Sequence, residues 1–155
     1  ISSQSLLRKY SELEIVRRFV KYPQYLHYVT SCNNYFWQPR LMQRWQRKGY
    51  WCNKCAKCVF LFACFTAFLP KEKVVSIFRA DLYTKEKLMR TFKRILGIES
   101  FKPLDCVGEP EEMILAMHLA VRDKEYEGEV MLKMFVENFK SYDFENAKNR
   151  IFCYD

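Results

Sequence analysis

Apolar residues recur at three- and four-residue spacing along much of the chain, which is the pattern of amphipathic helices. The first such segment follows Ser11, a favourable N-cap residue with Glu14 three positions further on. Its apolar positions run from Ile15 to Val20, and Pro23 stands just beyond them. The sequence therefore predicts a capped helix that ends before the proline.

The same pattern predicts five more helices. They cover residues 55–68, 71–78, 85–96, 110–121 and 129–139. Thr84 is placed to cap the helix over 85–96, and Gly97 stands directly after that helix, where glycine is favoured. No segment shows the alternation of a strand, and no internal repeat is present. We therefore predict a mostly α-helical fold, divided into a helical domain over 1–122 and a helical C-terminal extension over 123–155.

Periodicity fails between residues 29 and 54, where Pro39 and Gly49 indicate a long irregular loop. This part of the chain is also basic: residues 1–60 hold eleven Lys and Arg against two acids, whereas 61–155 hold fifteen against sixteen. A basic field attracts the phosphates of a nucleotide, a nucleotide-sugar or a nucleic acid, although it can also be a plain solvated surface. The predicted phosphate-binding residues are Arg40, Arg44, Arg47, Lys54 and Lys57.

The composition predicts a protein that folds without disulfides and does not cross a membrane. Half of the 155 residues are hydrophobic, but the longest apolar stretch, residues 59–69, is shorter than the roughly 20 residues that span a bilayer. The chain begins at Ile1 without methionine or a secretory leader, and it holds seven cysteines, an odd number. We expect a piece of a longer, cytoplasmic protein in a reducing compartment.

Four cysteines form the most specific motif in the sequence. They are Cys32, Cys52, Cys55 and Cys58, the last three at a strict two-residue spacing. Four thiolates suit Zn²⁺ in a closed structural site, and Lys54 and Lys57 would offset the negative charge of that centre. The fold is thus predicted to be a small helical domain with a four-cysteine zinc knuckle and a long irregular basic loop.

Two other interpretations of these thiols stay open. They could be scattered buried cysteines, or they could hold an iron–sulfur cluster, although the next cysteine, Cys64, comes six residues after Cys58 and lies in the middle of an apolar helix. Of the two histidines, His27 could be an additional ligand, and His118 is expected to be packed on a helix.

The chain resembles a known family at "SELEIV", "TSCNNYF" and "WCNKCAKCVFLF", and further on at "IFRADLYT" and "LDCVGEPEE". These segments look like the C-terminal part of the ATP-dependent epimerase that acts on UDP-N-acetylmuramoyl-L-alanyl-L-glutamate in bacterial wall synthesis. The likeness runs from Ser2 to Glu112, and we expect the tail after Arg122 to be peculiar to this protein. The resemblance implies an isomerase that uses ATP and Mg²⁺, acts on a nucleotide-sugar peptide and carries zinc.

The helix, Ser-Cys turn and cysteine knuckle are also similar to the zinc-bearing tail of the queuosine-pathway cyano-deazaguanine synthase. Both families activate a carboxylate as its adenylate, with a glycine-rich phosphate loop in an N-terminal domain. The four glycines of this chain are isolated, so it has no such loop. The resemblance therefore implies that the ATP-binding domain is the partner of this one, and that the chain alone is inactive.

The catalytic residues are unknown from the sequence. Epimerisation requires two groups that exchange a proton on opposite faces of a carbon. Cys106 beside Asp105 is one candidate, with a small buried thiol as the plain alternative, and Asp81 could contact Mg²⁺. Arg79 and Ala80 stand before Asp81 where the family resemblance leads us to expect small, glycine-rich residues.

Other functions fit the same residues. The loop aromatics, which are Tyr35, Trp37, Trp45 and Tyr50, together with its arginines would suit a uridine ring and diphosphate, or equally a single-stranded nucleic acid. The alternatives are therefore a zinc-stabilised nucleic-acid-binding module, an interaction domain with purely structural zinc, and the tail of another carboxylate-adenylating ligase.

Overall fold

The computed structural model describes residues 4–34, 50–99, 103 and 105–152. Its α-helices are α1 (Glu12–Phe19), α4 (Ala56–Thr66), α5 (Lys71–Phe78), α6 (Met89–Ile95), α7 (Pro110–Arg122), α8 (Val130–Asn138) and α9 (Phe144–Ile151). Short 3₁₀ turns lie at Pro23–Tyr25 (η1) and Glu86–Leu88 (η2). No strand occurs within the described residues, so the predicted mostly α-helical fold is confirmed.

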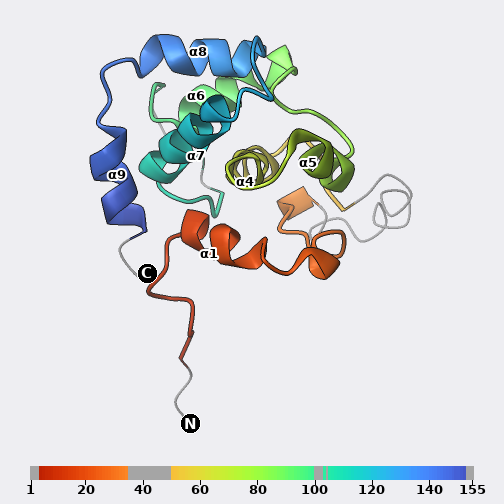
Figure 1. The fold of residues 1–155 in the computed structure, drawn as a ribbon. Coiled ribbons are helices and arrows are strands. Elements are labelled where there is room, and N and C mark those ends of the chain that lie inside the picture. Colours follow the sequence, from red (N-terminus) through yellow and green to blue (C-terminus); the bar gives the residue numbers. More distant parts are fainter. Residues whose placement is uncertain (1–3, 35–49, 100–102, 104, 153–155) are drawn as a thin grey trace.

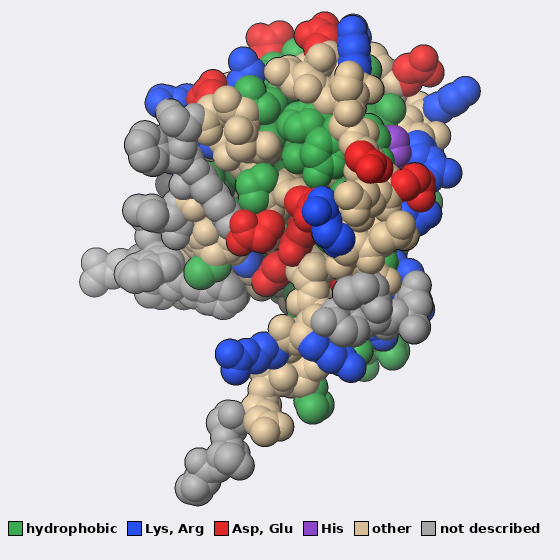
Figure 2. Space-filling view, turned by 90° about the vertical axis from the view of Figure 1, so that its left-hand side faces the viewer, with side chains coloured by type: hydrophobic (Ala, Val, Ile, Leu, Met, Phe, Trp, Pro, Cys, Tyr) green, Lys and Arg blue, Asp and Glu red, His purple; other side chains and the backbone are tan. Residues whose placement is uncertain are grey.

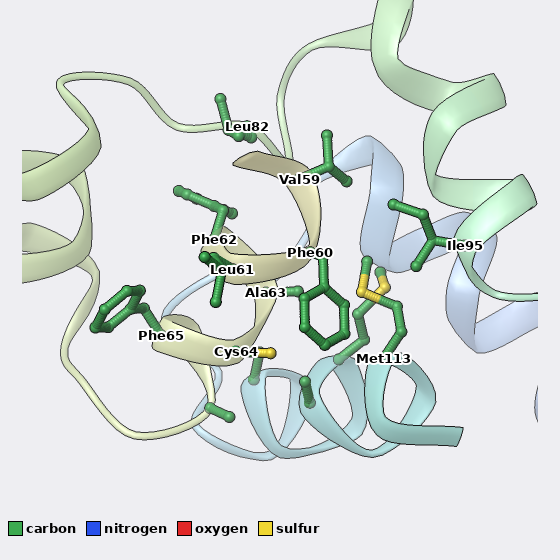
Figure 3. Packing of buried hydrophobic residues seen from close by; sticks show 14 of the residues in the cluster. Val59, Phe60, Leu61, Phe62, Ala63, Cys64, Phe65, Leu82, Ile95 and Met113 are labelled. Atoms are coloured by element: carbon green, nitrogen blue, oxygen red, sulfur yellow. The ribbon is translucent and has the colours of Figure 1, made fainter. Parts of the chain in front are cut away.

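Helix α4 is the centre of the molecule. Its sequence is apolar except for Lys57 and Thr66, and every one of its residues is buried. It packs against α1, α5, α6 and α7, which surround it in Figure 1. Figure 3 shows Phe60 and Cys64 on the side of α4 that faces Met113 of α7. Burial of this one helix therefore organises the core, and Cys64 lies in that core as predicted.

The helix ends follow local rules at two of the predicted positions. The Ser11 side chain accepts a hydrogen bond from the Glu14 backbone N–H at 3.1 Å, so the predicted cap of α1 is confirmed. Gly97 has φ +74° and follows α6, and the Gly97 and Ile98 N–H groups return to carbonyls of the last turn. These two bonds form a Schellman motif.

The predicted cap at Thr84 is wrong. Its hydroxyl donates to the carbonyl of Asp81 at 3.0 Å, within the preceding turn. The predicted helix over 85–96 consequently begins with the 3₁₀ turn η2 and becomes α-helical only at Met89. Local side-chain bonding to the turn competed with helix capping at this threonine.

Helices α8 and α9 lie along the C-terminal part of the chain, and both pack against α7. Helix α9 was not among the predicted helices, because its eight residues include three charged ones and only Ala147 and Ile151 are buried. His118 of α7 stacks on Phe144 of α9 with ring centroids 3.7 Å apart, so its predicted packing role is confirmed. The division of the chain at residue 122 stays a prediction.

Charges of both signs are interspersed on the face that Figure 2 shows, around a central hydrophobic area. Within the described ranges, no helix is long and apolar enough to cross a bilayer.

Candidate metal centre

The four cysteines of the motif come together in space. The Sγ atoms of Cys32, Cys52, Cys55 and Cys58 all lie within 4.8 Å of one another. The separations are 3.5 Å between Cys55 and Cys58, 3.7 Å between Cys52 and Cys58, and 4.0 Å between Cys32 and Cys55. These distances are too long for disulfides, in which the two sulfurs are about 2 Å apart. The cysteines are therefore free thiols that surround one point.

Two segments supply these thiols, and local contacts hold the segments together. The Thr30 hydroxyl donates to the Tyr50 carbonyl at 2.6 Å, and it accepts the Cys32 N–H at 3.2 Å. These two hydrogen bonds link the segment of Cys32 to Tyr50, which lies two residues before Cys52. The other three cysteines stand at the start of α4, where Cys55 is the N-cap residue and Cys58 lies in the first turn.

The turn between Cys52 and Cys55 is fixed by Asn53. Its φ of +57° is in the left-handed region, which asparagine adopts more readily than most residues. The Asn53 amide donates to the carbonyl of Phe78 at 2.8 Å, and the Trp51 ring stacks on the Phe78 ring with centroids 4.5 Å apart. The knuckle is thus anchored to the end of α5.

Hydrogen bonds favour the thiolate form at two of the four cysteines, Cys52 and Cys55. The Cys55 N–H and the Asn34 side-chain amide both donate to the sulfur of Cys52 at 3.4 Å. Hydrogen bonding from the Cys32 thiol lowers the pKa of Cys52 and also lowers the pKa of Cys55 to about 7. The pKa of Cys58 is raised, first through its hydrogen bond with Cys32. The pKa of Cys32 is also raised, first through its hydrogen bond with Cys52. A metal ion that binds these sulfurs would displace the remaining protons.

The donor set fits a single thiophilic ion. Four sulfurs at about 2.3 Å from a tetrahedral zinc would lie about 3.8 Å from one another, close to the separations observed here. Partial positive charge at the α4 N-terminus would offset some of the negative charge of four thiolates. Because thiolates prefer soft metals, zinc suits this set better than magnesium or calcium.

The two lysines of the knuckle have different environments. Lys54 is exposed, whereas Lys57 is 7% exposed and its ammonium donates to the backbone carbonyl of Cys106. Nearby, the Asn33 side chain donates to the carboxylate of Asp105 at 2.7 Å. These contacts bring the segment of Cys106 against the knuckle, although it lies about fifty residues further along the chain. The predicted binding of phosphate by Lys54 and Lys57 stays a prediction.

The alternative of a buried Cys106 is wrong, because its side chain is exposed. The other candidate, Asp81, is held by structural contacts: it accepts the Tyr83 N–H at 2.9 Å and pairs with the Lys71 ammonium at 3.1 Å. Lys71 in turn pairs with Glu129 at 2.8 Å. A catalytic role for either residue stays a prediction.

His27 is not among the residues grouped with the four cysteines. Its exposed ring lies 3.4 Å from the ammonium of Lys73 on α5. The loop residues predicted to bind phosphate or bases, which are Tyr35, Trp37, Arg40, Arg44, Trp45 and Arg47, lie outside the described residues.

Glu112 is a buried carboxyl that the sequence did not single out. It is 8% exposed, and one of its oxygens accepts the Leu13 N–H in the first turn of α1 at 3.2 Å. Burial raises its pKa to about 7. Gly108 lies against it, because a Cβ at Gly108 would meet the Glu112 carboxylate and would be 2.5 Å from the ring of Phe60. Ninety-nine residues separate Glu112 from Leu13, so no local pattern could have indicated this contact.

The fold and the cysteine cluster define a class of small helical domain in which four cysteines that could hold a metal ion join an N-terminal segment to a central apolar helix. The family model of the MurL C-terminal domain matches residues 28–150. The chain belongs to this family. The match extends through α8 into α9, which corrects the expectation that the tail after Arg122 is peculiar to this protein.

Three curated proteins are similar to most of the chain, and each is named UDP-N-acetyl-alpha-D-muramoyl-L-alanyl-L-glutamate epimerase. The one from Micromonospora sp. is 37% identical over 133 residues, which are 86% of this chain and 28% of that protein. The one from Salinispora tropica is 37% identical over 115 residues, 74% of this chain and 24% of that protein. The one from Xanthomonas oryzae pv. oryzae is 32% identical over 138 residues, 88% of this chain and 29% of that protein.

This chain therefore spans less than a third of the length of these relatives. No solved structure matches it significantly.

Proposed function

We propose that this chain is the C-terminal, zinc-containing domain of an ATP-dependent epimerase that converts the terminal L-glutamate of UDP-MurNAc-L-Ala-L-Glu to D-glutamate. The observation that carries the proposal is family membership together with a cluster of four cysteines whose sulfurs lie within 4.8 Å of one another. The three relatives bear the name of this activity, and the aligned residues are less than a third of each. The remainder of the enzyme would supply ATP binding, and this domain alone would be inactive.

The proposed reaction requires activation of the glutamate carboxylate and proton transfer on both faces of the α-carbon. The α-proton of glutamate is weakly acidic beside a carboxylate, and attack of that carboxylate on ATP would give an acyl-adenylate and pyrophosphate. The adenylate makes the α-proton acidic enough to be removed on one face and returned on the other. Hydrolysis of the adenylate would then release AMP. Both the ATP-binding residues and the proton-transferring groups are left to the complete enzyme.

The role proposed for zinc is structural. All four positions of a tetrahedral ion would be filled by protein sulfurs, which leaves no position for substrate or water. The sulfur separations of 3.5–4.0 Å support one ion rather than a cluster in which the thiolates bind different irons. The ion would then fix residues 30–34 and 50–55 to the start of α4. Arg40, Arg44 and Arg47, in the loop between these two fixed ends, would contact the diphosphate of the substrate.

The complete enzyme tests the activity. It should release AMP and pyrophosphate when given ATP, Mg²⁺ and UDP-MurNAc-L-Ala-L-Glu, and in D₂O the product should carry deuterium at the glutamate α-carbon. The 155-residue chain alone should release neither product. AMP release that is indifferent to the muramoyl dipeptide would refute the epimerase proposal.

Metal analysis tests the zinc site separately. Purified protein should contain close to one zinc per chain and no iron. A chain that folds fully in the presence of a chelator and without metal would refute the structural role.

A further inference from the structure

Two side chains adjacent to predicted metal ligands reach the same distant segment. Asn33 directly follows Cys32, and its amide donates to the Asp105 carboxylate at 2.7 Å. Lys57 directly precedes Cys58, and its ammonium donates to the Cys106 carbonyl. One contact therefore comes from each of the two cysteine-bearing segments, and both end within residues 105–106.

The Lys57 contact is strongly constrained by burial. The residue is 7% exposed, and a buried ammonium without an acceptor is costly. If residues 105–106 moved away, the buried Lys57 ammonium would lose this acceptor. The position of its ammonium and the position of the distant segment are therefore coupled.

The segment around Cys106 is also held by a hydrogen bond within it and by packing at Gly108. The Val107 N–H returns to the Asp105 carbonyl at 2.8 Å, which makes a tight turn at Cys106. Gly108 then fits closely against Phe60 of α4, where no side chain has room. The Cys106 side chain itself is exposed at the apex of this turn.

We propose that residues 105–107 are part of the metal centre, and that metal binding and the placement of the exposed Cys106 turn are thermodynamically linked through Asn33 and Lys57. This inference rests on the proposed zinc site. Metal binding fixes Cys32 and Cys58, and thereby orients the two donors that hold the turn. Because such coupling is reciprocal, anything that holds or displaces the turn changes the affinity for the metal by the same factor. The centre therefore positions a surface segment and does more than join the loop ends.

Asp105 gives the sharpest test, because it is distant in sequence from every cysteine ligand. Asp105→Ala removes the acceptor for Asn33, whereas Asp105→Asn keeps a carbonyl oxygen in the same place. Zinc affinity of the 155-residue chain would be measured by competition with a chromophoric chelator, on variants shown to be folded by circular dichroism. We expect Asp105→Ala to bind zinc about tenfold more weakly, the lower end of the effect of losing such an outer contact, and Asp105→Asn to bind within about twofold of the wild type.

Lys57→Met tests the second contact, and Lys54→Met is its matched control. Both changes remove one positive charge from the knuckle, but only Lys57 is buried against the turn. At saturating zinc, hydrogen exchange of residues 105–108 should rise in Lys57→Met and stay at the wild-type rate in Lys54→Met. This second measurement also decides the matter if Asp105→Ala fails to fold.

The outcomes separate this inference from the metal proposal. If the wild-type chain binds no zinc, the metal proposal itself fails. If the wild type binds zinc but Asp105→Ala binds it equally well, or if Lys57→Met leaves exchange at 105–108 unchanged, the coupling is refuted and the zinc site stands.

Discussion

Replacement of Glu112 by glutamine should change the pH dependence of stability in a defined direction. The carboxyl is buried between α7 and the start of α1, and burial raises its pKa from 4.5 to about 7. The folded protein therefore binds this proton more tightly than the unfolded chain does. The resulting stabilisation is complete below pH 4.5, declines as the pH rises, and is lost above pH 7, where the ionised carboxylate is held in a buried site. Glutamine is neutral throughout and can still accept the Leu13 N–H.

The shift in pKa sets the size of this effect. A difference between 4.5 and about 7 corresponds to about 3 kcal/mol of unfolding free energy, of which about 2.5 kcal/mol should appear between pH 5 and pH 8.5. Over this range, Glu112→Gln should gain stability relative to the wild type by that amount. Protonation of the thiolates acts in the opposite direction, since it weakens metal binding at low pH. Because both proteins share that effect, it cancels in their difference.

Urea unfolding at half-unit steps of pH, at saturating zinc, would measure this difference. Glu111→Gln is the matched control: it removes a carboxylate one position earlier on α7, where the side chain pairs with the exposed Arg150. A stability difference between Glu112→Gln and wild type that stays constant from pH 5 to pH 8.5 would show that Glu112 is not a buried proton-binding group.

Three further predictions concern the centre and the packing around it. Cys55→Ser should lose most of the bound zinc, and the melting temperature should fall sharply; full zinc content by elemental analysis would exclude this cysteine as a ligand. Gly108→Ala should destabilise the fold by about 1–3 kcal/mol, because its methyl group would lie 2.5 Å from the Phe60 ring, and an unchanged urea midpoint would contradict this. Ser11→Ala should cost about 1 kcal/mol through loss of the α1 cap, whereas the same change at the exposed Ser5 should cost little; equal effects would argue against capping.

The cysteine cluster shows how much of a metal site can be predicted from the spacing of cysteines in the sequence. Three thiols two residues apart predicted a metal site, because a single turn at the start of a helix can direct all three toward one point. The motif also indicated Cys32, and the structure brings its sulfur to 4.0 Å from that of Cys55. The predicted contribution of the arginine loop stays a prediction, since those residues lie outside the described part of the chain.

What the sequence by itself determined is local. Helix α5 covers the predicted residues 71–78, α1 carries the predicted Ser11 cap, and Gly97 closes α6. Each of these depends on side chains within one or two turns of the backbone they affect. The apolar character of α4 is equally local, and it predicted a buried helix without indicating its neighbours.

Only the tertiary structure decided which distant residues share an environment. Glu112 became a buried proton-binding group because α1 packs its first turn over that carboxyl, and Lys57 turned inward because the chain brings the Cys106 carbonyl to it. A carboxylate or an ammonium looks the same in sequence whether it faces water or the core. Its pKa and its partners follow from burial, and burial is set by how the helices around α4 pack.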